Sequence, residues 1–232
     1  MIAVETLRDI WNAFDFTYII NLVASVIPSL LCISFHELSH GMVAYALGDD
    51  TAKRAGRLSM NPLKHIDVMG LFMMMVFHVG WAKPVPVNMR KFRSPKAGMA
   101  VTALAGPLSN IVLSAVFIFV YGALYLPLGS SAAGKFVLNL LLTGSYMSIG
   151  LAVFNLIPVP PLDGSKILFS FLSDRAYMKL MKYERYFSLI LFVLVGSGIL
   201  SRPLSLARNT IYGFFAPLAD FSYRIVRNLF YR

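Results

Sequence analysis

The stretch His36-Glu37-Leu38-Ser39-His40 lies inside an apolar run that extends from Tyr18 to Leu47. Apart from tyrosine and the single cysteine, His36, Glu37 and His40 are the only ionisable residues of this run. A charged side chain in the middle of a membrane helix costs several kcal/mol, so such residues usually have a function. Because the run exceeds the ~20 residues that a helix needs to cross a bilayer, it predicts a membrane span that carries a functional site.

The spacing of the two histidines favours a metal site. Residues four apart lie on one face of an α-helix, so His36 and His40 would present their imidazoles in the same direction. Two such imidazoles can bind one Zn²⁺, and Glu37 can act as the base for a metal-bound water, as in H-E-x-x-H metalloproteases. The alternative is a pair of buried histidines bonded to backbone or water. Inside a membrane run, we favour the metal site.

The composition indicates an integral membrane protein. The 232 residues are 57% hydrophobic and only 14% are charged, against roughly 25% in soluble domains. The net charge of +10 comes from basic segments between the apolar runs. This pattern favours positive-inside topology and contact with anionic lipid head groups, and it argues against nucleic acid as a partner. The single cysteine, Cys32, excludes an intrachain disulfide.

Long apolar runs predict the membrane spans. After a lead-in over residues 1–16, we expect spans over about 17–47, 97–125 and 136–157, and weaker apolar stretches over about 186–200 and 209–222. The expected fold is therefore an all-α polytopic membrane protein with about four to six membrane segments. Because the chain shows neither an internal repeat nor a low-complexity linker, we expect a single integral-membrane domain over 1–232, with a catalytic core over about 17–170.

Three stretches differ from these spans. Residues 68–81 are apolar but too short to cross a bilayer, which favours a re-entrant or interfacial segment. The alternating prolines of 82–88 forbid a helix and favour an extended backbone, so we expect a small re-entrant or β-like loop near residues 68–90. Residues 165–185 have the pattern of an amphipathic, basic interfacial helix.

The distribution of Lys and Arg predicts the orientation in the membrane. Segments 48–96 and 158–185 carry nine and five of these residues, whereas the loop 126–135 and the N-terminus carry one each. By the positive-inside rule, the first two segments are cytoplasmic. The C-terminal ends of the first and third spans then lie on the same side, which we expect to be the cytoplasmic side of a bacterial inner membrane.

A third protein ligand is needed, because a catalytic zinc usually has three protein ligands and a water. Asp163 is the best candidate, since it follows the broken end of the third span at the expected depth of His36 and His40. Asp163 could equally be the N-cap of a helix that starts near Ser165. Three other residues compete for the ligand role, namely Asp67, His65 and His78.

Taken together, three motifs resemble the site-2 protease family of intramembrane zinc metalloproteases, in its compact bacterial form. The motifs are His36-Glu37-Leu38-Ser39-His40, Asn61-Pro62-Leu63-Lys64-His65-Ile66-Asp67 and Asn155-Leu156-Ile157-Pro158-Val159-Pro160-Pro161-Leu162-Asp163-Gly164, and the Gly80–Asn88 and Ala105–Asn110 stretches are also similar to the family. The resemblance covers about residues 30–170. One departure is Val68, where the family usually has proline; it bears on the local loop shape and on any role of His65.

The resemblance implies a role for each matching residue. Asp163 would be the third zinc ligand, and Glu37 would be the general base. Asn155 would line the site and hold the substrate carbonyl or its oxyanion, and His65 is a further candidate for substrate contact. The Gly80–Asn88 stretch would belong to a membrane-associated β-like loop near the cleft.

These observations predict an intramembrane zinc metalloprotease with one Zn²⁺ per chain. It would hydrolyse peptide bonds in or near transmembrane segments of membrane-protein substrates, in the manner of regulated intramembrane proteolysis. The main alternative is a non-enzymatic metal-dependent membrane transporter or scaffold, which would also explain membrane histidines and broken helices. That alternative explains poorly why Glu37 adjoins His36. A protease that has lost activity and serves as a scaffold is a second alternative, against which the intact Glu37 argues.

Overall fold

The computed structural model describes residues 16–70 and 82–231, and this part is helical with no β-strand in it. Its helices are α2 (Phe16–Ala46), α3 (Thr51–Arg54), α5 (Pro95–Leu128), α6 (Ala132–Asn155), α7 (Asp163–Phe169), α8 (Asp174–Lys182), α9 (Glu184–Gly196) and α10 (Ser201–Phe230), with the short 3₁₀ helices η1 (Pro62–Lys64) and η2 (Met89–Lys91) between α3 and α5. The expected lead-in over residues 1–16 lies almost wholly outside the described residues.

Three helices, α2, α5 and α6, are long and apolar enough to cross a membrane. The pair α9 and α10 passes the same test but is bent by 81° at its break, so the described part of the chain has three or four candidate spans. This confirms the all-α polytopic fold; the expected four to six segments are reached only if the bent pair counts as one span. The expected stretch 209–222 is part of the longer α10, because Arg202 and Arg208 interrupt the apolar pattern without interrupting the helix.

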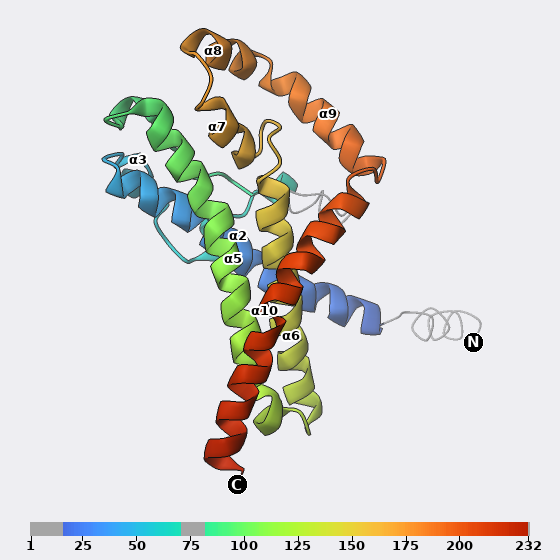
Figure 1. Cartoon of the computed structure of the whole chain (residues 1–232). Helices are drawn as coiled ribbons and strands as arrows, with labels where there is room; N and C mark the ends of the chain where they lie inside the picture. Colours follow the sequence, from blue (N-terminus) through green and yellow to red (C-terminus); the bar gives the residue numbers. More distant parts are fainter. Residues whose placement is uncertain (1–15, 71–81, 232) are drawn as a thin grey trace, which may run out of the picture.

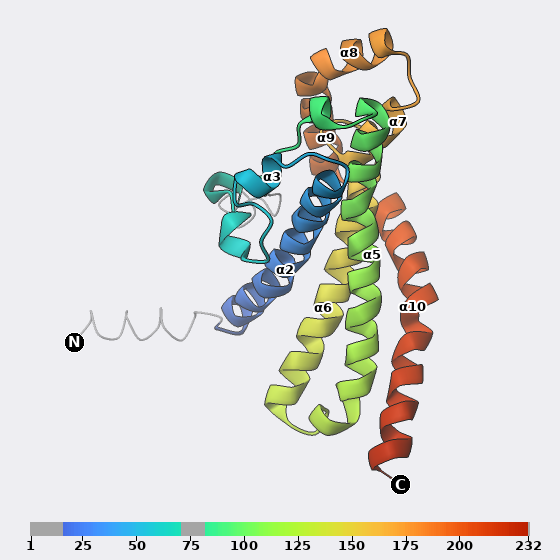
Figure 2. The same ribbon diagram turned by 90° about the vertical axis from the view of Figure 1, so that its left-hand side faces the viewer.

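Helix α5 lies at the centre of the bundle and contacts α2, α6 and α10 (Figures 1 and 2). Small residues allow these helices to approach closely. Gly144 of α6 faces the ring of Phe117 on α5, and Gly122 of α5 faces the backbone of Ala219 on α10. Helix α2 is tilted steeply against the α5–α6 pair (Figure 2), which brings the C-terminal half of α2 against the first half of α5.

A layer of buried polar side chains joins α5 to α6. Ser114 and Ser145 share a hydrogen bond of 2.7 Å, and the Ser148 hydroxyl donates to the carbonyl oxygen of Asn110 at 2.8 Å. All four residues are buried. Because lipid gives membrane helices no hydrophobic reason to associate, such bonds stabilise their packing. This layer fixes the register of α6 against α5 at the level of Asn110.

The described segments between α2 and α5 lie beside the C-terminal half of α2 (Figure 2). Asp49, just after α2, is fully buried and accepts hydrogen bonds from the backbone N–H groups of Thr51 and Asn88, at 3.0 and 2.6 Å. A buried carboxylate needs such donors, because an unsatisfied one is costly. Asp49 therefore ties residues 82–88 to the end of α2.

The β-like loop expected near residues 68–90 forms no strand in its described part. Residues 68–70 are helical, residues 83–88 have no regular secondary structure, and η2 starts at Met89. The loop's only regular pairing in that part is one antiparallel bridge between Ile66 and Ala82, beside a hydrogen bond of 2.9 Å from the Lys83 N–H to the His65 carbonyl oxygen. The expected re-entrant segment 68–81 falls mostly on residues 71–81, which lie outside the described residues together with His78.

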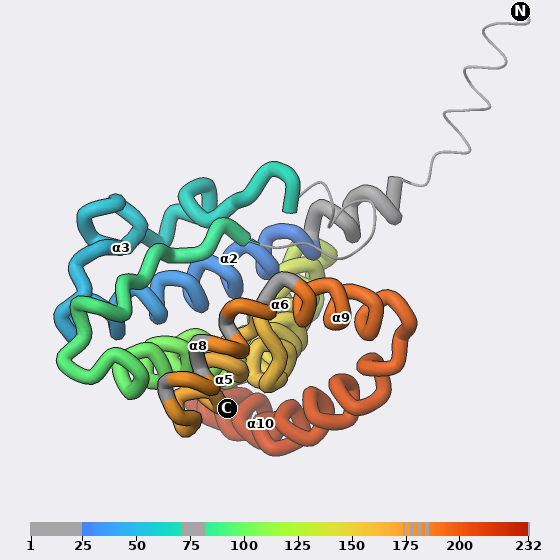
Figure 3. Tube along the Cα trace, turned by 90° about the horizontal axis from the view of Figure 1, so that it is seen from above, coloured from blue at the N-terminus to red at the C-terminus, as the bar shows by residue number. Residues whose placement is uncertain are grey.

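Prolines end α6 and return the chain toward α2. The turn contains Pro158, Pro160 and Pro161, none of which has a backbone N–H to continue a helix. Gly164 then packs so closely on the Leu156 carbonyl oxygen that a Cβ would overlap it. The expected amphipathic helix over 165–185 is divided into α7 and α8, and α9 and α10 then curve round α6 (Figure 3).

Candidate metal centre

Three buried side chains converge where α2, α5 and α7 meet. His36 and His40 lie one turn apart on α2, and Asp163 is the first residue of α7. The Nε2 atoms of His36 and His40 lie 3.1 and 3.0 Å from Asp163 Oδ2, and the three potential ligand atoms lie within 4.8 Å of one another. Tetrahedral zinc ligands lie roughly 3.3–3.6 Å apart, so small shifts would admit the ion. The spacing rule therefore placed both histidines on one face correctly.

Asp163 is a carboxylate in this setting. Burial by itself would raise the pKa of its carboxyl group, but hydrogen bonds with His36 and His40 and the charge of Lys166 together hold that pKa well below its usual value. The residue is not a helix cap: the N-cap of α7 is Leu162, and the Asp163 side chain points to the histidines. An ionised carboxylate beside two imidazoles is a donor set that suits Zn²⁺.

Nδ1 of His40, the ring nitrogen that faces away from Asp163, determines which ring nitrogen is available to a metal. His40 Nδ1 lies 2.7 Å from the carbonyl oxygen of Thr102 on α5. A carbonyl only accepts, so Nδ1 carries a hydrogen. The Nε2 atom bonds to Asp163 through a hydrogen, and loss of that hydrogen would free its lone pair for a metal. This is the usual outer-shell arrangement of a metal-binding histidine.

The outer nitrogen of His36 meets the side-chain amide of Asn110, also on α5. The Asn110 Nδ2 lies 3.1 Å from His36 Nδ1, whereas the buried Asn110 Oδ1 has no hydrogen-bond partner. A half-turn of the amide exchanges these two atoms, so that His36 Nδ1–H donates to Oδ1 and both groups are satisfied. His36 Nε2 would then likewise offer its lone pair to a metal. This contact joins α5 to α2.

Asp163 has an outer partner of its own. Lys166, one turn along α7, donates from Nζ to Asp163 Oδ1 at 3.1 Å. This leaves Oδ2 as the oxygen that faces both histidines. Each of the three side chains thus has its outer atom held by a neighbouring group, and the residues present fit a zinc ion with one coordination position open.

Gly106 allows α5 to approach the histidines. A Cβ at this position would overlap His40 Nε2 and lie 2.6 Å from His36 Cε1. The absent side chain of Gly106 thus permits the close approach of α5 to α2. No side chain larger than hydrogen fits while both rings keep their places.

We expect Gly106→Ala to lower zinc affinity by at least the roughly 10–100-fold seen when an outer-shell partner is lost, because the new methyl displaces two ligands at once. Zinc content of the purified protein measures this. Gly213→Ala is the matched control: Gly213 lies in α10 with nothing within 4 Å of an added Cβ. A normal zinc content in Gly106→Ala would show that the imidazole rings of His36 and His40 can shift and still bind the ion.

Glu37 lies on α2 beside the ligands, and its carboxylate accepts a hydrogen bond of 2.8 Å from the backbone N–H of Val85. Glu37 and the three ligands line one cleft of about 500 Å³. The extended segment supplies one wall of the cleft with Pro84, Val85 and Val87, and Asn155 lies on another wall at the end of α6. The cleft is large enough for a short stretch of extended peptide.

The remaining candidates lie apart from the three ligands. His65 is buried, its Nε2 bonds to the Ser59 carbonyl oxygen at 2.8 Å, and it is not among the residues that line the cleft. Asp67 accepts from the Gly70 N–H at 2.9 Å and so caps its own loop. The sequence analysis did not identify Thr102 or Lys166. The Thr102 contact is made by backbone and leaves no sequence signal, whereas a lysine three residues after a candidate ligand could have been noticed.

Comparisons with known proteins agree with this site. Residues 123–197 match the model for peptidase family M50, a range that contains Asn155 and Asp163. The proposed zinc metalloprotease YwhC of Bacillus subtilis is 34% identical over 203 residues, which cover 83% of this chain and 91% of YwhC. The proposed zinc metalloprotease Rip2 of Mycolicibacterium smegmatis is 26% identical over 205 residues, or 87% of this chain and 75% of Rip2. No solved structure gives a significant match.

A third relative, a proposed zinc metalloprotease of Methanocaldococcus jannaschii, is 30% identical over 161 residues, which cover 67% of this chain and 76% of that protein. The extent of the YwhC match decides the assignment, because it spans most of both chains. Zinc is accordingly the cofactor of this protein, and its long apolar helices make it an integral membrane protein. The chain belongs to peptidase family M50, the site-2 protease family of metalloproteases.

Proposed function

We propose that this metalloprotease cleaves membrane-spanning protein substrates in or near their transmembrane segments, in the manner of regulated intramembrane proteolysis. The observation that carries the proposal is the position of His36, Glu37 and His40 on α2, a candidate membrane span, with their side chains in one cleft. A substrate that lies in the membrane can reach such a cleft without leaving the bilayer. We further propose that residues 1–232 act as one domain, with the catalytic core over about 17–170.

His36, His40 and Asp163 would hold the zinc ion, one per chain. When bound, zinc lowers the pKa of its water toward neutrality and polarises a carbonyl group. Glu37 would take the proton of that water and pass it to the leaving amine, as a general base and then a general acid. Asn155 lines the cleft and has an amide that would bind the substrate carbonyl, with His65 as the more distant candidate for substrate contact.

The substrate must be extended at the bond that is cut, because the carbonyl groups of a helix are shielded. The segment 82–88 offers an extended backbone along the cleft, and we propose that the substrate pairs with it by strand addition. Val85 already donates its N–H to Glu37, so the segment that receives the substrate also contacts the base.

Cleavage in liposomes tests the proposed substrate class. Purified protein is reconstituted with a single-span peptide labelled at both ends, and products are mapped by mass spectrometry. We expect a zinc-dependent cut inside the apolar segment or within a few residues of it, lost with a chelator and restored by Zn²⁺. A soluble peptide with the same flanking sequence should stay intact. Cleavage of the soluble peptide alone would contradict the proposal, and bound zinc without cleavage of either would favour the metal-dependent transporter or scaffold.

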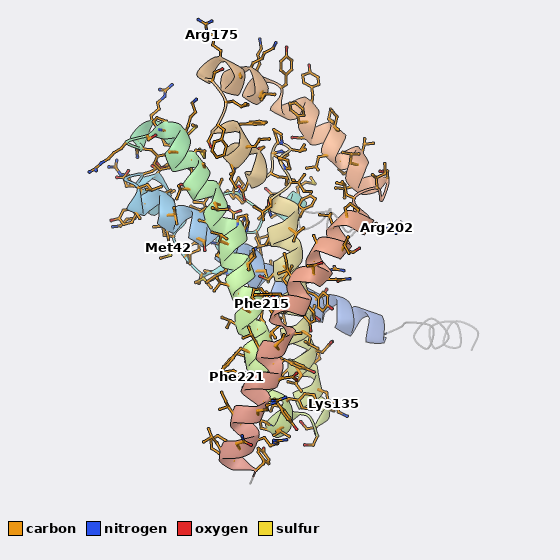
Figure 4. All side chains as sticks on the ribbon, viewed as in Figure 1. Met42, Lys135, Arg175, Arg202, Phe215 and Phe221 are labelled. Carbon is orange, nitrogen blue, oxygen red and sulfur yellow. The ribbon has the colours of Figure 1, made fainter. Side chains whose placement is uncertain are left out.

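We propose that the active site faces the cytoplasm of a bacterial cell membrane. The described parts of the basic segments 48–96 and 158–185 lie toward one end of the bundle, as Arg175 shows, and Lys135 lies toward the opposite end (Figure 4). The metal centre is formed where α2 ends and α7 begins, near the basic end. Positive-inside topology then places the cleft toward the cytoplasm.

Cysteine labelling checks this orientation in a Cys32→Ala background. Leu63 and Phe171 are 74% and 83% exposed in the two basic segments, and Lys135 is exposed at the other end. We expect a membrane-impermeant maleimide to label Leu63→Cys and Phe171→Cys only from the cytoplasmic side, and Lys135→Cys only from the outside. Labelling of Leu63→Cys from the outside would reverse the orientation.

A further inference from the structure

A second cavity, of about 690 Å³, lies between α6 and the start of α10. Gly150 and Phe154 of α6 form one wall, and Arg202, Ser205 and Arg208 of α10 form another. Phe154 lines the metal cleft as well. The cavity is therefore at the same end of the bundle as the metal centre, separated from it by α6, and the label of Arg202 in Figure 4 marks its position.

Arg208 is held in this cavity by an aromatic side chain but lacks a partner for its charge. Its guanidinium carbon lies 5.4 Å from the centre of the Tyr146 ring, and Tyr146 stacks on Tyr212 with ring centres 4.3 Å apart. Such a contact orients a guanidinium group. The buried Nε of Arg208 nevertheless has no hydrogen-bond acceptor, which is costly for a charged donor.

Within the part of the chain that the structure describes, no carboxylate compensates the charge in the cavity. No Asp or Glu side chain that the structure describes forms an ion pair with Arg202 or Arg208. Two apolar side chains near the arginines are exposed, Ile199 just before α10 by 65% and Leu206 of α10 by 69%. The site thus combines one arginine oriented by an aromatic ring, a second arginine beside it, and exposed apolar side chains that suit acyl chains.

We propose that this cavity binds the phosphodiester head group of an anionic glycerophospholipid. Arginine presents parallel N–H groups that match two phosphate oxygens, and basic pockets between membrane helices are known to bind anionic head groups. Arg208 would bind the phosphate from the aromatic side and Arg202 from the mouth of the cavity. The acyl chains would lie along the apolar surface next to Ile199 and Leu206. This site is independent of the metal chemistry.

Native mass spectrometry of the purified full chain tests the proposal. The probes are phosphatidylglycerol, phosphatidylcholine with the same acyl chains, and inorganic phosphate. We expect one phosphatidylglycerol to stay bound with at least tenfold higher affinity than phosphatidylcholine, and inorganic phosphate not to compete with it. Equal binding of the two lipids would overturn the proposal, and full competition by inorganic phosphate would show a site for a soluble anion instead.

Two variants locate the site. Arg208→Gln removes a charge-assisted pair and should weaken phosphatidylglycerol binding roughly tenfold or more. Gly150→Leu should do the same by filling the cavity, since a Cβ there meets nothing nearer than Arg208 Cδ at 4.0 Å. Arg224→Gln, on the far part of the same helix, is the matched control and should bind normally. Normal binding by both Arg208→Gln and Gly150→Leu would contradict the proposed site.

Discussion

Replacing Asp163 with asparagine is expected to remove zinc from the purified protein and to abolish cleavage. The Oδ2 atom of Asp163 faces both histidines, and its charge offsets that of the ion in a buried site. A neutral amide would leave the ion with two nitrogen ligands, next to the uncompensated charge of Lys166. The loss of affinity should exceed the roughly 10–100-fold that accompanies loss of an outer-shell partner. Zinc content and cleavage of a single-span substrate measure it.

Asp67→Asn is the matched control for this experiment. Asp67 also lies in a loop after a proline-containing motif, but its Oδ1 only accepts the Gly70 N–H, which an asparagine can also bind. We expect zinc and activity near the wild-type level. The helix-cap interpretation of Asp163 predicts little change in Asp163→Asn, because Asn caps as well as Asp and a cap contributes about 0.5–2 kcal/mol. Normal zinc in Asp163→Asn, together with an inactive Asp67→Asn, would move the third ligand to Asp67.

Glu37→Gln should keep zinc and fold but lower the rate of cleavage by about 10²–10⁴-fold, the usual contribution of a general base. The substitution changes little besides the basicity of the side chain, because glutamine keeps an oxygen that can accept the Val85 N–H and so hold the same rotamer. What is lost is the capacity to take a proton from water. Zinc content, thermal unfolding and the turnover number are measured on the same preparation.

Ser39→Ala provides the control within the same motif. The Ser39 hydroxyl donates to the Phe35 carbonyl oxygen of its own helix, and Ser39 is not among the residues that line the cleft. It should therefore retain activity close to wild type. A Glu37→Gln enzyme that cleaves within about tenfold of wild type would fall below the range for a general base and would assign that role to another group.

The sequence predicted the spans well because apolar length is a strong signal in a membrane protein. The bounds of α2, α5 and α6 follow from it directly. It was less informative after Asp163, where charged residues and short apolar runs alternate. The start of α10 lies eight residues before the expected stretch, because Arg202 and Arg208 lower the local hydropathy while the backbone stays helical. Helix continuity there depends on packing against α5 and α6, which a single sequence does not show.

For the metal centre, the sequence identifies the two histidines better than it identifies the aspartate. The helical period alone brought His36 and His40 together, and the structure confirms that geometry. Asp163 could be either a ligand or a cap on position alone, since the path of the chain after α6 decides which way its carboxylate points. No sequence motif could predict the hydrogen bond from His40 to Thr102, because its acceptor is a backbone carbonyl oxygen and every residue has one.

The hydrogen bond between Glu37 and Val85 has a consequence for how activity depends on conformation. A glutamate side chain on a helix surface samples several rotamers, and fixing one of them costs conformational entropy. Here the segment 82–88 removes that freedom during folding, so the carboxylate is already oriented when a substrate arrives. The donor, however, belongs to a connecting segment that Asp49 holds to the end of α2 through Asn88. If Glu37 is the base, as proposed, an event that draws this segment away from α2 would leave the three candidate zinc ligands in place and yet make proton transfer inefficient.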